Sequence, residues 1–358
     1  MDICYGGVPA KVPDDSNSMG IRGYDYVEFY VGSAKMVAYW HAMAMGLEIK
    51  AYSGPEYGVK DRTSYYLEGT HGLKIVITSA LKPHAYDIQY FQKMHGDGVK
   101  RWSVEVVDVK ETFEKAVKNG AVPVRKPEKL EDDQGYVMEA AIRLYDDTEI
   151  VFINRDNYEG IFKPGFGEPV QNFDLNREET GLKFIDHIVG NVHINEMDYW
   201  ANYINKALDF ETFIDFGPGD ISTQYSALLS KVVRSKDEII KNPINEPFEA
   251  AKLSQIEEYT QEYYGSGIQH IAIATKDIVS SIRALRKNGV EFLEAPDTYY
   301  DELAQKDFGL EEDINDLREL GILCDVEGTG YLLQLFTKPI GDRPTFFYEI
   351  IQRKKGAK

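Results

Sequence analysis

The sequence predicts an α+β fold made of two similar halves, because three short segments of the first half recur in the second. Each half also contains two copies of one unit, a strand followed by a helix and a strand pair. The recurring segments are 23–32 with 183–192, 101–106 with 269–274, and 151–155 with 349–353. A length of 358 residues corresponds to about two domains of ordinary size. We therefore expect one domain at residues 1–165 and a second at 166–358.

Hydrophobic patterning and helix stop signals give the order of the elements. A helix over 33–44 follows the first strand, with Ser33 as its cap and Gly46 just beyond its end. In the first half we expect strands at 24–31, 64–68, 73–78, 102–107, 139–144 and 149–154, and a second helix at 109–119. Gly and Pro are frequent over 160–170, which is the expected linker. The second half repeats this order from Phe184.

The composition indicates a globular protein with an acidic surface. Asp and Glu number 59 against 40 Lys and Arg, and the net charge of −19 is spread along the chain. Nucleic acids and anionic membranes bind clustered Lys and Arg, so we expect neither as a partner. Neither a secretory signal nor an apolar run of membrane-helix length is visible, which predicts a cytoplasmic protein. Cys4 and Cys324 are too few for a disulfide framework.

Three residues of the second half that can bind a metal are each replaced in the first half. The repeat pairs His187 with Tyr26, His270 with Trp102, and Glu349 with Val151. Two imidazoles and one carboxylate on one face leave up to three positions open on an octahedral ion, as in non-haem Fe(II) oxygenases. A lone His in an apolar strand is more often an ordinary core or surface residue, whereas Glu is rarely buried without a partner. Because all three are lost together from the first copy, we predict a single metal site, in the second half.

Five motifs, all of them in the second half, carry a specific resemblance. They are 186–191 (DHIVGN), 243–247 (PINEP), 269–272 (QHIA), 332–339 (LLQLFTKP) and 342–353 (DRPTFFYEIIQR). Together they resemble the 4-hydroxyphenylpyruvate dioxygenase family, over about Gly23 to Arg353. The resemblance implies the vicinal oxygen chelate fold, with a metal-free barrel in the first half and a catalytic barrel in the second.

The resemblance also implies a set of site residues. Fe(II) is expected on His187, His270 and Glu349, beside a substrate pocket formed by Ser230, Asn245, Gln255, Gln269, Gln334, Phe336 and Phe347. Asn245, Gln255 and Gln269 are expected to act in catalysis, and the two Phe rings to pack against an aromatic substrate. Ser254 begins a capping-box pattern, which puts Gln255 in the first turn of a helix. Gln269 adjoins His270, so it requires a bulge, a twist or a position behind the metal ligands.

The activity implied by the resemblance is the conversion of 4-hydroxyphenylpyruvate and O2 to homogentisate and CO2 in tyrosine and phenylalanine catabolism, by a homo-oligomer (dimer or tetramer). Three alternatives stay open. 4-Hydroxymandelate synthase takes the same substrate but oxidises the benzylic carbon, and Phe336 with Asn245 favours the dioxygenase. An isomerase or extradiol enzyme with another metal is disfavoured by the motif set and by the long insertion at 298–321. A non-enzymatic ligand-binding protein would not need the metal ligands.

Two segments bear on how the site is covered. The insertion at 298–321 is rich in Tyr, Leu and acidic residues and is expected to be partly helical. Members of the family usually continue past Gln352 and Arg353 into a C-terminal helix that closes over the iron, whereas this sequence stops at Lys358. A lid of this kind keeps water from the reaction. Since none is visible in this sequence, we expect an open iron pocket, bordered by the insertion.

Overall fold

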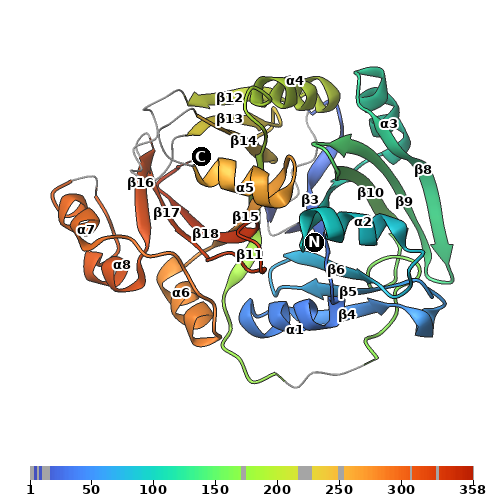
Figure 1. Cartoon of the computed structure of the whole chain (residues 1–358), viewed down its shortest axis with the longest axis horizontal. Helices are drawn as coiled ribbons and strands as arrows, with labels where there is room; N and C mark the ends of the chain where they lie inside the picture. Colours follow the sequence, from blue (N-terminus) through green and yellow to red (C-terminus); the bar gives the residue numbers. More distant parts are fainter. Residues whose placement is uncertain are drawn as a thin grey trace.

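In the computed structural model the chain forms two eight-stranded sheets of the same topology (Figure 1). The structure describes residues 4–5, 8–9, 17–170, 175–216, 228–248, 254–306, 309–327 and 330–357. The strands of the first sheet are β3 (Ile21–Tyr30), β4 (Glu48–Ser53), β5 (Arg62–Glu68), β6 (Lys74–Ala80), β7 (Gly98–Val106), β8 (Pro123–Asp132), β9 (Gly135–Leu144) and β10 (Thr148–Tyr158). Those of the second are β11 (Leu182–Asn191), β12 (Glu211–Phe216), β13 (Leu228–Arg234), β14 (Lys241–Pro247), β15 (Gly267–Thr275), β16 (Leu323–Glu327), β17 (Gly330–Phe336) and β18 (Phe347–Lys354). Two short strands, β1 (Cys4–Tyr5) and β2 (Val8–Pro9), pair with each other.

Each sheet consists of two βαβββ units, which confirms the predicted fold class. The strand orders are β4-β5-β6-β3-β7-β10-β9-β8 and β12-β13-β14-β11-β15-β18-β17-β16. Within each unit the last strand lies parallel to the first, and the two first strands pair antiparallel at the centre of the sheet. The helices are α1 (Ala34–Ala44), α2 (Tyr86–His95), α3 (Val109–Lys118), α4 (Met197–Leu208), α5 (Gln255–Tyr263), α6 (Ile278–Lys287), α7 (Asp297–Leu303) and α8 (Ile314–Leu320), with a 3-10 turn at Pro55–Tyr57.

Helix caps recur at equivalent places in the repeated units. The carboxylates of Asp108 and Asp277 accept the backbone N–H three residues on, at the starts of α3 and α6. Ser254 accepts the N–H of Glu257 at 3.1 Å, so the predicted capping box begins α5. Ser33 occupies the cap position of α1 as predicted, but its hydroxyl makes no capping hydrogen bond.

The two halves share one apolar core. His41 in α1 lies fully buried, and its Nε2 accepts a hydrogen bond at 2.9 Å from the hydroxyl of Tyr348 in the other half. The Tyr145 ring packs on β11 so closely that a Cβ on Gly190 would lie 2.0 Å from its hydroxyl. Glycine is therefore required at this position of the 186–191 motif, since any side chain would separate the halves.

The insertion at 298–321 forms α7 and α8, as its partly helical pattern predicted. Arg283 of α6 pairs with Asp316 of α8 at 2.6 Å, and the Tyr299 hydroxyl donates to the carbonyl of Cys324 in β16 at 2.9 Å. These contacts place the insertion against α6 and the edge strand β16, away from the central strands of the sheet (Figure 1). Among the described residues, no helix has the length and apolar character needed to span a bilayer.

Candidate metal centre

Three neighbouring strands of the second sheet bring the predicted ligands together. His187 lies in β11, His270 in β15 and Glu349 in β18, with β15 in the middle. Both His187 and Glu349 are register partners of Ala272. Since residues two apart in a strand share a face, His270 projects from the same face as the other two. The three side chains therefore share one face of the sheet, as expected, although register slips in β11 and β15 interrupt the regular alternation before His187 and before His270.

The three side chains converge on one carboxylate oxygen. Nε2 of His187 lies 3.2 Å from Oε2 of Glu349, and Nε2 of His270 lies 3.3 Å from the same atom. One ligand atom from each residue lies within 4.8 Å of the others. The Glu349 side chain is 2% exposed, against 12% for His187 and 10% for His270. The carboxylate is therefore held deepest, with the two imidazoles between it and solvent.

A strand irregularity beside each histidine supplies a partner for its other ring nitrogen. The register slips between Ile185 and His187, and Asp186 accepts a hydrogen bond from Nδ1 of His187 at 2.8 Å. A second slip leaves Gln269 without a register partner, and its Oε1 accepts from Nδ1 of His270 at 2.9 Å. The bulge that Gln269 required is thus present. With Nδ1 donating, each Nε2 is free to offer a lone pair.

Without a metal, these groups form a buried ion pair. Burial lowers the pKa of His187, but the charges of Glu349 and Asp186 outweigh it and raise the pKa to about 9. Burial raises the pKa of Glu349, yet the two histidines lower it to about 2. For His270 burial dominates, and its pKa falls below the usual range. The metal-free centre therefore holds one imidazolium, one neutral imidazole and one carboxylate.

The donor set fits a divalent first-row metal ion. Glu349 Oε1 is buried and has no hydrogen-bond partner in the described part of the chain, which is costly for a carboxylate oxygen. A cation replacing the proton on His187 would satisfy this oxygen and both Nε2 lone pairs. Two imidazole nitrogens and one carboxylate oxygen are the donors of the facial iron triad.

Of the seven predicted pocket residues, five lie on the sheet face that carries these ligands, and a sixth contacts a ligand. Register pairing places five of them on the ligand-bearing face. Phe336 pairs with Glu349 and Phe347 pairs with His270. Ser230 pairs with Asn245, which pairs with Asn191, and Gln334 lies two residues before Phe336. The sixth, Gln269, contacts His270 directly. The Phe347 ring stacks on His270 at 4.9 Å between centroids, and Phe336 meets Phe347 edge to face at 5.9 Å. An aromatic wall therefore adjoins the ligands.

Two of the predicted pocket residues, Gln255 and Gln334, have surroundings that the sequence did not predict. Gln255 is exposed at the first residue of α5, and its place in the substrate pocket stays a prediction. Gln334 donates from Nε2 to the carboxylate of Asp325 in β16. Burial raises the pKa of Asp325, and the charge of Glu349 adds to this rise. Asp325, which the sequence did not suggest, thus accepts one of the two N–H groups of the Gln334 amide.

Known proteins resemble this chain over nearly its whole length. No family model matches it. A 4-hydroxyphenylpyruvate dioxygenase from Yarrowia lipolytica is 43% identical over 363 aligned residues, covering 97% of this chain and 91% of that protein. The chain belongs to the 4-hydroxyphenylpyruvate dioxygenase family. The protein of this name from Tetrahymena thermophila is 39% identical, covering 92% of this chain and 84% of its own length. A mutant 4-hydroxymandelate synthase from Streptomyces coelicolor shares the fold with a TM-score of 0.81 and 27% identity, over 94% of both chains.

Membership in the 4-hydroxyphenylpyruvate dioxygenase family confirms the resemblance read from the five motifs. The family is one of non-haem iron enzymes, which agrees with a His, His and Glu group able to hold a metal.

In the first half, Arg101 occupies the place of His270, which corrects the prediction of Trp102 at that position. Glu28 pairs with Arg101 as Val189 pairs with His270. Trp102 therefore points to the opposite face, where it lies fully buried in the shared core. The predicted counterparts of the other two candidate ligands, Tyr26 and Val151, keep their places. Val151 pairs with Ser103 as Glu349 pairs with Ala272. Ser103 lies two residues after Arg101, and Ala272 lies two residues after His270.

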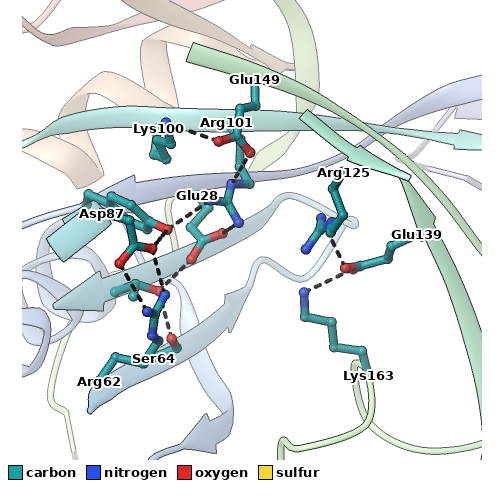
Figure 2. A network of polar contacts seen from close by, with 12 residues as sticks. Glu28, Arg62, Ser64, Asp87, Lys100, Arg101, Arg125, Glu139, Glu149 and Lys163 are labelled. Atoms are coloured by element: carbon teal, nitrogen blue, oxygen red, sulfur yellow. Dashed lines mark hydrogen bonds and ion pairs between the residues drawn. The ribbon is translucent and has the colours of Figure 1, made fainter. Parts of the chain in front are cut away.

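Arg101 forms ion pairs at the place where the second half carries the candidate ligand His270. Its guanidinium lies 3.2 Å from Glu28 and 3.3 Å from Glu149, on the two flanking strands (Figure 2). A second group in the same view joins Glu139 to Arg125 and Lys163. An arginine is always protonated and has no lone pair for a metal. The guanidinium thus bridges three strands by charge, at the position that His270 occupies in the other half.

Sequence reasoning also missed Asp186 and Arg353 as part of the centre. Arg353 donates to Asp186 through Nε at 3.0 Å and Nη2 at 2.7 Å. The signal for them was available, since both residues lie in segments that recur in the first half, as Asp25 and Arg155.

Proposed function

We propose that this chain is an Fe(II)-dependent dioxygenase that converts 4-hydroxyphenylpyruvate and O2 to homogentisate and CO2. The observation that carries the proposal is the convergence of His187, His270 and Glu349, whose buried Oε1 has no hydrogen-bond partner among the described residues, in a chain of this family. We further propose that the chain divides near residue 165 into a metal-free barrel and a catalytic barrel.

His187, His270 and Glu349 would hold Fe(II), which supplies the oxygen chemistry when bound. With only three protein ligands, such an ion would stay accessible to a 2-oxo acid substrate. The dioxygenase therefore needs no second 2-oxo acid as a co-substrate, since its substrate is itself a 2-oxo acid and would supply the electrons.

The remaining residues bind and orient the substrate. Phe336 and Phe347 project beside the ligands and would pack against the phenol ring, which fixes the carbon that reacts. Ser230 and Asn245 are buried on the same face and would hydrogen-bond the polar ends of the substrate. Gln269 is already committed to Nδ1 of His270, so its contribution is to orient that ligand.

A second candidate is 4-hydroxymandelate synthase, which the structural similarity at a TM-score of 0.81 favours. Both activities start from the same substrate, so the product decides between them. The purified chain should be incubated in air with Fe(II), ascorbate and 4-hydroxyphenylpyruvate, and the products separated by chromatography. Homogentisate is the expected product, and the Glu349→Gln variant should form none. 4-Hydroxymandelate would support the second candidate, and no product from the wild type would contradict both.

A further inference from the structure

A carboxylate–guanidinium pair recurs at the same place in both halves. Asp25 lies 2.6 Å from Arg155 in the first half, and Asp186 lies 2.7 Å from Arg353 in the second. The arginine side chains are similarly covered, 17% and 21% exposed. Because the metal-free half keeps the pair, the pair alone has a structural function that does not depend on a metal.

The second partner of the aspartate differs between the halves. In the first half, Asp25 accepts a hydrogen bond from Nζ of Lys74 at 2.9 Å. In the second, Asp186 accepts one from Nδ1 of His187 at 2.8 Å. In the second half, a candidate metal ligand thus takes the place beside the aspartate that Lys74 holds in the first half.

The backbone makes this contact possible. Neighbouring residues of a regular strand point to opposite faces, so an aspartate could not reach the next side chain. The register slip between Ile185 and His187 leaves Asp186 without a register partner in β15, and its carboxylate then reaches the adjacent ring. Arg353 binds both oxygens of this carboxylate, through Nε and Nη2, and a two-point contact of this kind fixes orientation as well as charge.

We propose that Asp186, held by Arg353, is a positioning residue that fixes His187 with its proton on Nδ1 and its Nε2 lone pair directed at the metal. Metal-ligating histidines commonly donate their other N–H to a carboxylate, which sets the tautomer and strengthens the ligand. His270 has only the neutral amide of Gln269 in the same role. The two histidines therefore differ, and His187 is the ligand held by charge. The inference rests on the proposed metal centre.

The duplication provides a matched control for the test. Asp186→Asn and Asp25→Asn each remove the charge of one aspartate from equivalent ion pairs, and only the first touches a metal ligand. Binding of Co(II) to the metal-free full-length chain is measured by the visible absorption of the bound ion, and stability by thermal unfolding without metal. Both variants should unfold at lower temperature than the wild type. Co(II) should bind about 10- to 100-fold more weakly to Asp186→Asn, with an altered spectrum, and unchanged to Asp25→Asn.

A graded series protects the test against misfolding. Asp186→Asn keeps an oxygen that can accept from Nδ1, so it should weaken Co(II) binding less than Asp186→Ala, and Asp186→Glu should restore part of the affinity. Equal Co(II) affinity for the wild type and Asp186→Asn, or equal losses in Asp186→Asn and Asp25→Asn, would overturn the positioning role. If the wild type itself binds no Co(II), the proposed metal centre fails, and that result is distinct from both.

Discussion

Removing the metal should make the stability of this chain depend on the proton held by His187. The carboxylates of Glu349, at 3.2 Å, and Asp186, at 2.8 Å, overcome the effect of burial and raise its pKa to about 9, whereas the unfolded chain should have the ordinary value of about 6.5. The folded state therefore binds this proton more tightly. Its contribution is fully present below pH 6.5 and is lost as the pH rises to about 9.

The size of the effect follows from the two pKa values. The difference between 6.5 and about 9, at 1.36 kcal/mol for each pKa unit, corresponds to about 3 kcal/mol of unfolding free energy. Urea unfolding of the EDTA-treated protein at pH 6 and pH 9 measures the loss. Glu349→Gln removes the charge that raises this pKa most, so the variant should lose much less stability than the wild type over the same interval. Equal losses in the two proteins would refute the assignment of the proton to this pair.

Three further predictions concern the metal, the first half and the substrate. Adding Fe(II) to the metal-free chain near pH 8 without oxygen should release about one proton for each ion bound, because coordination requires neutral His187; an indicator dye that detects no release would contradict this. Arg101→Met should lower the unfolding free energy by about 3–5 kcal/mol, because Glu28 and Glu149 lose their buried partner, while the iron content stays unchanged; a loss of iron would show that the network acts on the metal centre. Phenylpyruvate should have a lower kcat/KM than 4-hydroxyphenylpyruvate, because the missing hydroxyl leaves buried polar groups unpaired at about 1–3 kcal/mol; steady-state kinetics giving equal values would contradict the pocket.

The repeat and the metal ligands could be predicted from the sequence because each depends on local pattern. His187 and Glu349 lie in strand segments that recur in the first half, and their joint replacement there marks them as one set. The error at Trp102 came from aligning two strands by their apolar residues. The distance to the end of the following helix gives the correct alignment of the two segments. Asn119 is 18 positions after Arg101, and Asn288 is 18 positions after His270.

The partners of the ligands could not be predicted, because they depend on irregular backbone. Asp186 and Gln269 reach the histidines beside them only where the strand register slips, and sequence alternation assigns both to the opposite face. Asp325 depends on the pairing of β16 with β17, which brings it to Gln334 from a different part of the chain. Interactions of this kind require the tertiary structure.

Anomalous X-ray scattering from crystals grown with Fe(II) can show whether one half of the duplicated fold holds the metal and the other does not. At the iron absorption edge, we expect one peak bound by His187, His270 and Glu349, and none among Tyr26, Arg101 and Val151. The peak should be absent from crystals of Glu349→Gln. A peak in the first half, or an iron in the second half that is not bound by these three side chains, would contradict this expectation.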